Sequence, residues 1–220
     1  MDNRQKPMGI GLLGFGTVGG GVYEFVQARS DMKIEYVLSR RPRPELRCTV
    51  TDDFSRIVAD PAVEVVIEAI GGLHPAYEYV TAALRAGKHV ITTAVEHSAI
   101  LETCKALEQE GYSVTYLKPD KNGNITVSQV ENALRDDTAL VTMMLVNNET
   151  GCIFPVAEVA QLLKEKKSRA LLHIDAVQGF LKIPFRADTL GADLISISGH
   201  KVGAPKGIGG LYLGGRVRAP

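Results

Sequence analysis

The chain has 220 residues, of which 45% are hydrophobic, and its 25 basic side chains balance its 25 acidic ones. This composition suits a protein that buries a core, and the balanced charge gives no bulk attraction to nucleic acid or anionic lipid. No apolar run approaches the roughly 20 residues of a membrane helix, and the polar start at Met1–Pro7 lacks the apolar stretch of a secretory signal. Three widely spaced cysteines, Cys48, Cys104 and Cys152, suit free thiols in a reducing compartment. We therefore expect a soluble, cytoplasmic protein without a nucleic-acid or membrane partner.

Short apolar runs alternate with amphipathic stretches along the chain, which is the pattern of a mostly parallel sheet covered by helices. In chain order the expected strands are Ile10–Leu13, Ile34–Leu38, Val63–Ile70, His89–Thr93, Val114–Leu117, Leu140–Val146, Ala170–Ile174, Leu194–Ser198 and Gly210–Leu213. The expected helices are Gly19–Arg29, Pro75–Ala86, Ala99–Glu110, Val127–Arg135 and Val156–Lys166, and Gly111 is the expected C-cap glycine of the third. The predicted fold class is therefore α/β.

A glycine-rich turn joins the first strand to the first helix, with the sequence Gly14-Phe15-Gly16-Thr17-Val18-Gly19. The G-x-G-x-x-G spacing between a strand and a helix is typical of a dinucleotide site. Gly14 permits the tight turn, Gly16 lets the backbone approach a pyrophosphate, and Gly19 lets helix and strand pack closely. The pyrophosphate would lie at the N-terminal end of the helix, at Thr17 and Val18. The alternative is a turn whose glycines serve packing alone.

Two arginines, Arg40 and Arg41, follow the second strand. An NAD site usually carries an acidic residue there for the ribose 2′-hydroxyl, whereas arginine suits a 2′-phosphate. This favours NADP(H) as the cofactor. The alternative, that both arginines belong to a solvated loop, is equally well supported and stays open.

Residues 8 to about 93 resemble homoserine dehydrogenase. The matching segments are Ile10–Val22, Thr51–Asp53, Ala59–Pro61, Val66–Gly72 and Ala86–Val90. The resemblance implies that Gly71 and Gly72 lie near the nicotinamide end of the cofactor. It ends where that family has a Thr-Ala-Asn-Lys segment, because this chain reads Thr92-Thr93-Ala94-Val95-Glu96. Without the family's lysine and substrate domain, we do not expect hydride transfer by this half alone.

Residues from about 87 to 220 resemble the cysteine desulfurases, which belong to the class V aminotransferase group. The landmarks are Glu96–His97, Val146–Gly151, His173–Gln178, Ser196–Lys201 and Gly203–Tyr212. A pyridoxal phosphate enzyme needs a lysine to hold the cofactor aldehyde as a Schiff base and a carboxylate to pair the pyridinium nitrogen. Lys201 and Asp175, which both follow apolar strands, suit these two roles.

The resemblance assigns the remaining contacts to pyridoxal phosphate. It implies that Gln178 hydrogen-bonds the ring hydroxyl, that His97 stacks over the ring, and that Asn148 lies beside it. It also implies that Ser198 and His200 hold the phosphate. Each residue has an ordinary alternative: Lys201 as a solvated surface lysine, Asp175 as a helix N-cap, and His97 as a satisfied polar residue.

Several parts of the desulfurase pattern are missing from this sequence. The Gly-x-Thr-type phosphate turn is replaced by the dehydrogenase-like segment, and we expect no counterpart of the family's sulfur-accepting cysteine or of its small C-terminal domain. Neither Cys104 nor Cys152 replaces that cysteine, because they fall in a helix and beside the Asn-Asn-Glu-Thr-Gly motif, where small buried side chains are typical. The chain is therefore expected at most to bind cofactor. The alternatives are an NADP(H)-binding module without chemistry and an inert chimera.

Both resemblances share the strand at Gly87–Thr93, which places the expected seam within residues 87–94. We predict a Rossmann-like parallel βαβ segment at 1–93 and part of a fold-type-I pyridoxal phosphate transferase domain at 94–220. A strand has two edges, yet Ile10–Leu13, Val114–Leu117 and Leu140–Val146 all compete for His89–Thr93. We expect one of these three pairings to be lost. Desulfurases of this group are dimers, so the resemblance also implies that a homodimer could form.

Overall fold

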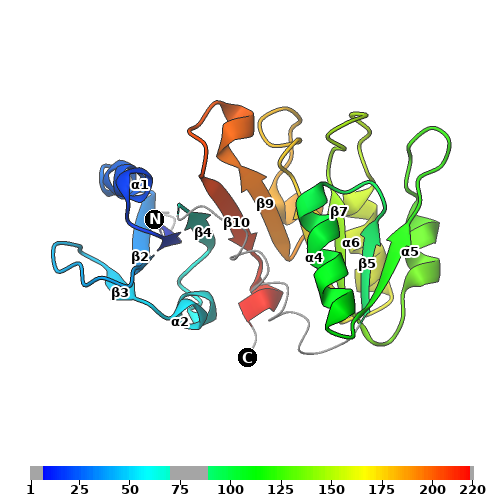
Figure 1. The fold of residues 1–220 in the computed structure, drawn as a ribbon, viewed down its shortest axis with the longest axis horizontal. Coiled ribbons are helices and arrows are strands. Elements are labelled where there is room, and N and C mark those ends of the chain that lie inside the picture. Colours follow the sequence, from blue (N-terminus) through cyan, green and yellow to red (C-terminus); the bar gives the residue numbers. More distant parts are fainter. Residues whose placement is uncertain (1–6, 70–88, 219–220) are drawn as a thin grey trace, which may run out of the picture. The chain divides into compact units, whose positions relative to one another are not determined.

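The computed structural model describes residues 7–69 and 89–218, which fall into two compact units. Unit 1 combines residues 1–72 with 198–220, and unit 2 spans residues 73–197 (Figure 1). The units do not follow the predicted seam within 87–94, because the end of the desulfurase-like sequence belongs to unit 1. The seam therefore remains a prediction about the origin of the two sequence segments.

Unit 1 is built on one sheet with the strand order β3-β2-β1-β4-β10. Its strands are β1 (Met8–Leu13), β2 (Met32–Leu38), β3 (Thr49–Thr51), β4 (Val65–Glu68) and β10 (Gly209–Leu213). The first four are parallel to their neighbours, as βαβ connections require, while β10 runs antiparallel to β4. The expected Rossmann-like parallel arrangement is confirmed for β1, β2 and β4.

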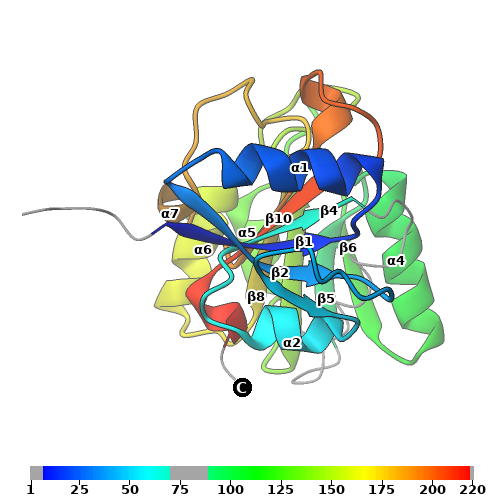
Figure 2. The same ribbon diagram turned by 90° about the vertical axis from the view of Figure 1, so that its left-hand side faces the viewer.

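Two helices cover opposite faces of the unit 1 sheet, α1 (Thr17–Gln27) and α2 (Phe54–Ala59) (Figure 2). Because side chains alternate along a strand, Ile10 and Leu12 of β1 face the cluster under α1, and Gly11 faces α2. A Cβ on Gly11 would lie 2.5 Å from Cγ2 of Ile57, so this glycine allows α2 to pack closely. Two short 3-10 helices, Gly199–Val202 and Gly215–Arg218, complete the described part of the unit.

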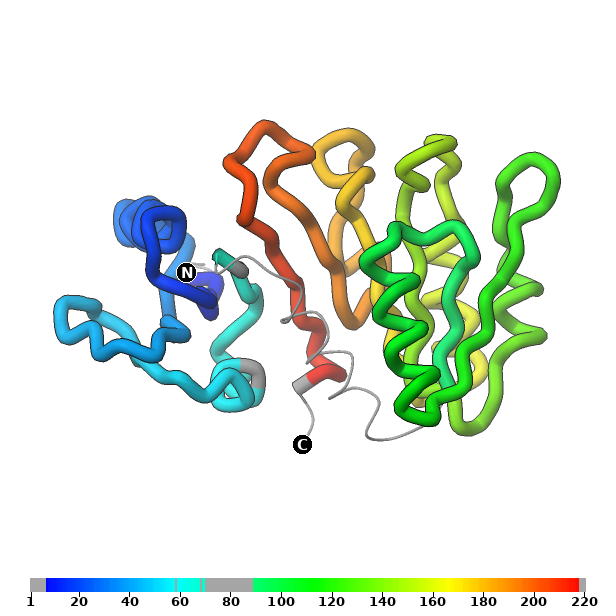
Figure 3. Tube along the Cα trace, in the orientation of Figure 1, coloured from blue at the N-terminus to red at the C-terminus, as the bar shows by residue number. Residues whose placement is uncertain are grey.

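Strand β10, which comes late in the sequence, joins the sheet that the early strands β1 to β4 form. Gly209 pairs with Glu68 and Tyr212 with Val65, and the two strands lie side by side in Figure 3. On its other edge β4 pairs with β1, and β3, a strand that the sequence analysis did not predict, lies beyond β2.

Unit 2 is built on a parallel sheet with the order β9-β8-β7-β5-β6. Its strands are β5 (His89–Thr93), β6 (Ser113–Leu117), β7 (Thr138–Met144), β8 (Leu171–Asp175) and β9 (Leu194–Ser198), the last of which ends at the unit boundary. β5 pairs with β6 and β7, whereas β1 pairs with β2 and β4. The expected loss of one of the three competing pairings is therefore confirmed.

Helices cover both faces of the unit 2 sheet, which explains why every residue of β5 and β7 is buried (Figure 1). The helices are α4 (Ser98–Gln109), α5 (Val127–Ala133), α6 (Val156–Glu165) and α7 (Ala187–Leu190). Cys104 and Leu107 of α4 pack against Val90 and Leu140. Gly111 follows α4 with φ of +88°, as its predicted capping role requires. The predicted helix at Pro75–Ala86 lies outside the described residues.

Candidate functional site

Asp175 is the last residue of β8 and lies at the carboxyl edge of a parallel sheet, where α/β folds bind their ligands. Its side chain is 7% exposed, and its Oδ1 accepts a hydrogen bond from the Val177 backbone N–H at 2.9 Å. Its own carbonyl oxygen accepts from Leu145 N–H at 2.9 Å. Asp175 thus closes a turn after a strand, so the alternative of a helix N-cap is wrong.

The loops that follow β5 and β7 carry the next predicted residues, His97 and Asn148, and both side chains are exposed. His97 is the N-cap of α4, because its Nδ1 accepts a hydrogen bond from Ala99 N–H at 3.2 Å. This satisfies one ring nitrogen, as the ordinary alternative expected. Nε2 and both faces of the ring are not engaged by that bond.

Asn147, which the sequence analysis did not single out, joins these two loops. Its Nδ2 donates to the carbonyl oxygen of Val95 at 2.9 Å. Its Oδ1 accepts from the backbone N–H groups of Glu149 at 3.0 Å and Thr150 at 2.8 Å. The buried amide therefore fixes the backbone on either side of Asn148. Only its position before a second asparagine could have indicated this role.

Gln178 lies three residues beyond Asp175 and is half-buried. Its Oε1 accepts a hydrogen bond from Nζ of Lys182 at 2.8 Å. The amide Nε2 is then the group that could donate to an oxygen of a ligand. The predicted contact of Gln178 with the ring hydroxyl stays a prediction.

His173 supports Asp175 from the interior of the same strand. Its Nδ1 lies 2.8 Å from Oγ1 of Thr142, and its Nε2 lies 3.1 Å from Oγ of Ser196, so the ring bridges three neighbouring strands. Burial lowers the pKa of His173, and the charge of Asp175 opposes that shift. The two hydrogen bonds hold the ring in the interior, so its role is structural.

Ser198, His200 and Lys201 belong to unit 1, whereas Asp175, His97, Asn148 and Gln178 belong to unit 2. Within the first group, Oγ of Ser198 lies 2.8 Å from Nδ1 of His200. Lys201 lies in the 3-10 helix after β9, is exposed, and has no ion-pair partner among residues 7–69 and 89–218. The structure thus groups the predicted phosphate and lysine positions separately from the predicted ring contacts.

The glycine-rich turn of unit 1 has the strand–turn–helix context that the sequence predicted. Gly14 has φ of +93°, and its N–H donates to the carbonyl oxygen of Leu38 at 3.1 Å. A Cβ on Gly19 would lie 2.2 Å from the Gly14 carbonyl oxygen, so the close approach requires glycine. Gly16 precedes α1 without a side-chain cap and borders open space, which leaves the N–H groups near Thr17 and Val18 accessible to an anion.

Arg40 and Arg41 are exposed after β2, where Oγ of Ser39 accepts from Arg41 N–H at 3.2 Å. A third arginine, Arg43, reaches the glycine-rich turn. Its Nη2 donates to the carbonyl oxygen of Phe15 at 3.3 Å, and its guanidinium lies 5.2 Å from the Phe15 ring centroid. The sequence analysis missed this contact, because only the fold brings residue 43 to residue 15. Gly71 and Gly72 lie outside the described residues.

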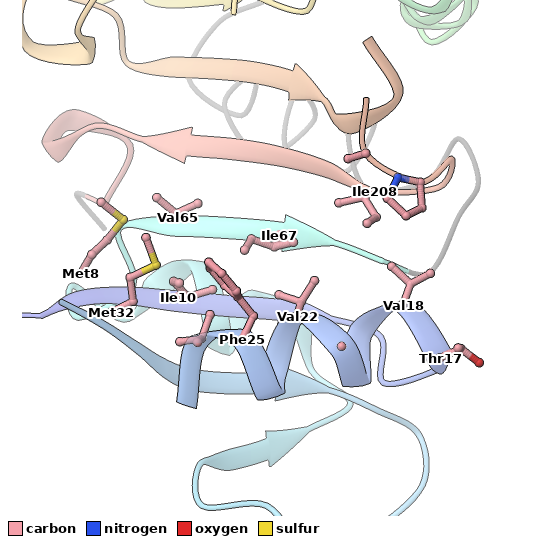
Figure 4. A pocket seen from close by; sticks show the side chains of 14 residues that line it. Met8, Ile10, Thr17, Val18, Val22, Phe25, Met32, Val65, Ile67 and Ile208 are labelled. Atoms are coloured by element: carbon pink, nitrogen blue, oxygen red, sulfur yellow. The ribbon is translucent and has the colours of Figure 1, made fainter. Parts of the chain in front are cut away.

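A hollow of about 780 Å³ lies beside α1 in unit 1. Figure 4 shows Val22 and Phe25 of α1 and Val65 and Ile67 of β4 pointing into it, and nearly all of its lining is apolar. Phosphates require N–H donors or cations. The hollow itself therefore does not suit a dinucleotide, whereas the turn at its Thr17 end does.

The chemical groups at the predicted positions fit both predicted cofactors. A buried carboxylate with one oxygen still available suits a protonated ring nitrogen, and an exposed histidine ring at the same sheet edge suits stacking.

In residues 7–69 and 89–218, no three His, Cys, Asp or Glu side chains form a group that could hold a metal ion. No helix in the described part of the chain is long and apolar enough to cross a membrane.

Comparison with known proteins supports both resemblances. Residues 72–218 match the family model described as aminotransferase class-V, and residues 14–115 match that of the homoserine dehydrogenase NAD binding domain. The cysteine desulfurase IscS of Aeromonas hydrophila is 53% identical over 127 residues, which are 58% of this chain and 31% of that protein. Cysteine desulfurase 2 of Trichormus variabilis is 45% identical over 157 residues, 70% of this chain and 39% of that protein.

Two solved structures are also similar to this chain. DndA from Streptomyces lividans matches with a TM-score of 0.56 and 41% identity over 72% of this chain and 44% of DndA. SspA in complex with cysteine matches with a TM-score of 0.62 and 35% identity over 72% of this chain and 46% of SspA. The chain covers only 31% and 39% of the lengths of the two curated relatives above. Because the aminotransferase class-V match extends over residues 72–218, well over half of the sequence, the chain belongs to the class-V aminotransferase family.

Proposed function

We propose that this chain binds pyridoxal phosphate through Lys201. The observation that carries the proposal is Asp175, a carboxylate 7% exposed at the carboxyl end of β8. A negative charge held there would keep a ring nitrogen protonated. The likeness to cysteine desulfurases supports this choice of cofactor.

Each remaining residue has a proposed role that its chemistry supports. His97 would stack on the ring, Gln178 would donate to the ring oxygen, and Asn148 would lie beside the ring. Ser198 and His200 would hold the phosphate, and their mutual hydrogen bond would orient the imidazole. When bound, pyridoxal phosphate supplies an electron sink for amino-acid chemistry. Cysteine is the amino acid to try first, because SspA has been solved in complex with it.

The test is a titration of the purified chain with pyridoxal phosphate, followed by the yellow absorption band of the lysine-bound cofactor. The Lys201→Ala variant should lose the band. Lys206→Ala is the matched control, because Lys206 is an exposed lysine five residues further along the same segment, and it should keep the band. A band that persists in Lys201→Ala, or no band in the natural sequence, would contradict the proposal.

A second candidate function is the binding of NADP(H) by unit 1, which the geometry of the Gly14–Gly19 turn favours. The match to a homoserine dehydrogenase NAD binding domain supports a nicotinamide cofactor. We propose a preference for the 2′-phosphate through Arg40 and Arg41. NADPH fluorescence should then change on binding and do so less for NADH, and Arg40→Ala with Arg41→Ala should abolish the preference. Equal binding of NADPH and NADH would contradict this preference and support the alternative that both arginines belong to a solvated loop.

A further inference from the structure

Glu96 is a buried carboxyl group in the loop after β5, immediately before His97. Only 5% of it is exposed. Its Oε1 accepts hydrogen bonds from Oγ1 of Thr93 at 2.7 Å and from Met144 N–H at 3.0 Å. Its Oε2 is enclosed and meets no hydrogen-bond partner in the described ranges 7–69 and 89–218. Ionised Glu96 would destabilise the folded chain, because its carboxylate would be a buried charge without a cation.

The surroundings of Glu96 favour its neutral form. Burial raises the pKa of Glu96 to about 8; the hydrogen bonds from Thr93 and Met144 oppose this shift, and the charge of Asp175 adds to it. On α4 the thiol of Cys104 interacts with Glu96, and burial raises the pKa of this thiol to about 12. β7 contributes the Met144 N–H, and His97 follows Glu96 in the chain. Since Oε1 already accepts two hydrogen bonds, the proton belongs on Oε2.

Glu96 also connects the strand ends that carry the proposed cofactor contacts. Thr93 ends β5 and Met144 ends β7, and both hydrogen bonds go to the same oxygen of Glu96. The next residue along β7, Leu145, donates its N–H to the carbonyl oxygen of Asp175. Two hydrogen bonds, joined through the peptide bond between Met144 and Leu145, therefore link the loop of His97 to the end of β8.

We infer that Glu96 is a positioning residue of the proposed pyridoxal phosphate site, a neutral acid that holds His97 and Asp175 in place without adding a second negative charge beside Asp175. The inference rests on the proposed function. It predicts that the shape of the side chain matters for cofactor binding and that its ionisation opposes the folded state. Gln has nearly the same shape as a protonated Glu and does not ionise, so Glu96→Gln separates the two effects.

The first experiment needs no cofactor. Infrared spectra of the natural chain should contain the carbonyl band of a protonated carboxylic acid at pH 7, which disappears with a midpoint near pH 8. Glu96→Gln should lack this band. Glu102→Gln is the matched control, because Glu102 is an exposed carboxylate on α4, and this variant should keep the band. A spectrum at pH 7 that is the same with and without Glu96→Gln would overturn the inference.

The second readout is the stability of unit 2 against pH, measured by hydrogen exchange. The unfolded chain releases the Glu96 proton near pH 4.5, whereas the folded chain keeps it until about pH 8. The stability that Glu96 contributes is therefore complete below pH 4.5 and is lost as the pH rises to about 8. The stability of Glu96→Gln relative to the natural chain should increase across this window. A constant difference would contradict a retained proton.

The third readout is cofactor binding. Glu96→Gln should bind pyridoxal phosphate almost as well as the natural chain, and Glu96→Ala about tenfold more weakly, since it loses both hydrogen bonds. Unchanged binding by Glu96→Ala would overturn the positioning role. If the infrared band is present and no variant, including the natural sequence, gives a yellow band, then the proposed function has failed, and the positioning role fails with it. If the yellow band forms normally but the infrared band is absent, only the present inference has failed.

Discussion

Unit 1 and unit 2 are both built on a sheet with helices on two faces, but the strands of the two sheets come from different parts of the chain. Unit 2 takes its strands from one continuous stretch of sequence, and each is parallel to its neighbour. Unit 1 takes four strands from the start of the chain and completes its sheet with antiparallel β10. Because the strands of unit 2 are contiguous in sequence, the sequence pattern could predict them. The joining of distant segments in unit 1 depends on pairings that no local pattern encodes.

The two units also differ in what their cores contain. Within the described residues, all of the buried polar and charged side chains lie in unit 2, including His89, His173, Glu96 and Asp175. His89 repeats the arrangement of His173, since its ring nitrogens each lie 2.9 Å from a threonine hydroxyl, on β7 and β6. The core of unit 1 is apolar. Buried polar networks fix one arrangement of strands, so unit 2 should be the more sensitive to loss of a single hydrogen-bonding group.

The largest expected effect comes from emptying the core of one unit. Leu140 of β7 is 1% exposed, and Leu140→Ala should lower the free energy of unfolding of unit 2 by about 3 kcal/mol, because it leaves a cavity. Hydrogen exchange should show reduced protection in β5, β7 and β8. Leu181→Ala, at an exposed position in the same unit, should change little. Equal loss of protection throughout residues 7–69 would contradict the division into units.

A smaller effect is expected from overfilling the glycine-rich turn of unit 1. Gly19→Ala places a Cβ 2.2 Å from a backbone oxygen, so the turn must shift, and unit 1 should lose about 2 kcal/mol. NADPH binding should weaken with it. Gly20→Ala is the matched control in the same helix, where a Cβ meets nothing within 4 Å, and it should raise stability by about 0.5 kcal/mol. Thermal unfolding of the two variants should therefore move in opposite directions.

The third prediction tests the polar core of unit 2. Thr142→Val removes the hydroxyl that lies 2.8 Å from Nδ1 of His173 and leaves a buried ring nitrogen without that partner. The cost should be about 1–2 kcal/mol. Thr142→Ser retains the hydroxyl and should recover most of this stability in chemical denaturation. If Thr142→Val and Thr142→Ser have the same effect, the hydroxyl does not stabilise unit 2. The contrast between a polar core in unit 2 and an apolar core in unit 1 is then weaker than proposed.

Most strands could be predicted because their residues form apolar runs, and His89–Thr93 and Leu194–Ser198 have the predicted bounds. The strand Thr49–Thr51 escaped prediction because three residues with two threonines give no hydrophobic signal. The strand predicted to reach Val146 ends at Met144. There the chain leaves the ladder, and Val146 instead makes an isolated antiparallel bridge with Ile153.

The candidate site was predictable to a similar degree. Residue type and order indicated Asp175 and the glycine-rich turn, because both follow apolar strands. The state of Glu96 could not be read from the sequence, since it depends on burial and on a backbone N–H 48 residues away. The contact of Arg43 with Phe15 has the same origin. Sequence patterns locate chemical groups, whereas the protonation state and partners of those groups depend on packing.

The place of β10 has a consequence for synthesis on the ribosome. Unit 2 ends at residue 197, so its strands leave the ribosome before residues 209–213 do. Until then β4 is without the neighbour that completes its pairing in the finished protein. An open strand edge is a template for pairing with other nascent chains. The strands of unit 1 that are translated before unit 2 therefore complete their sheet after it, and crowded polysomes are where they would be most prone to misassemble.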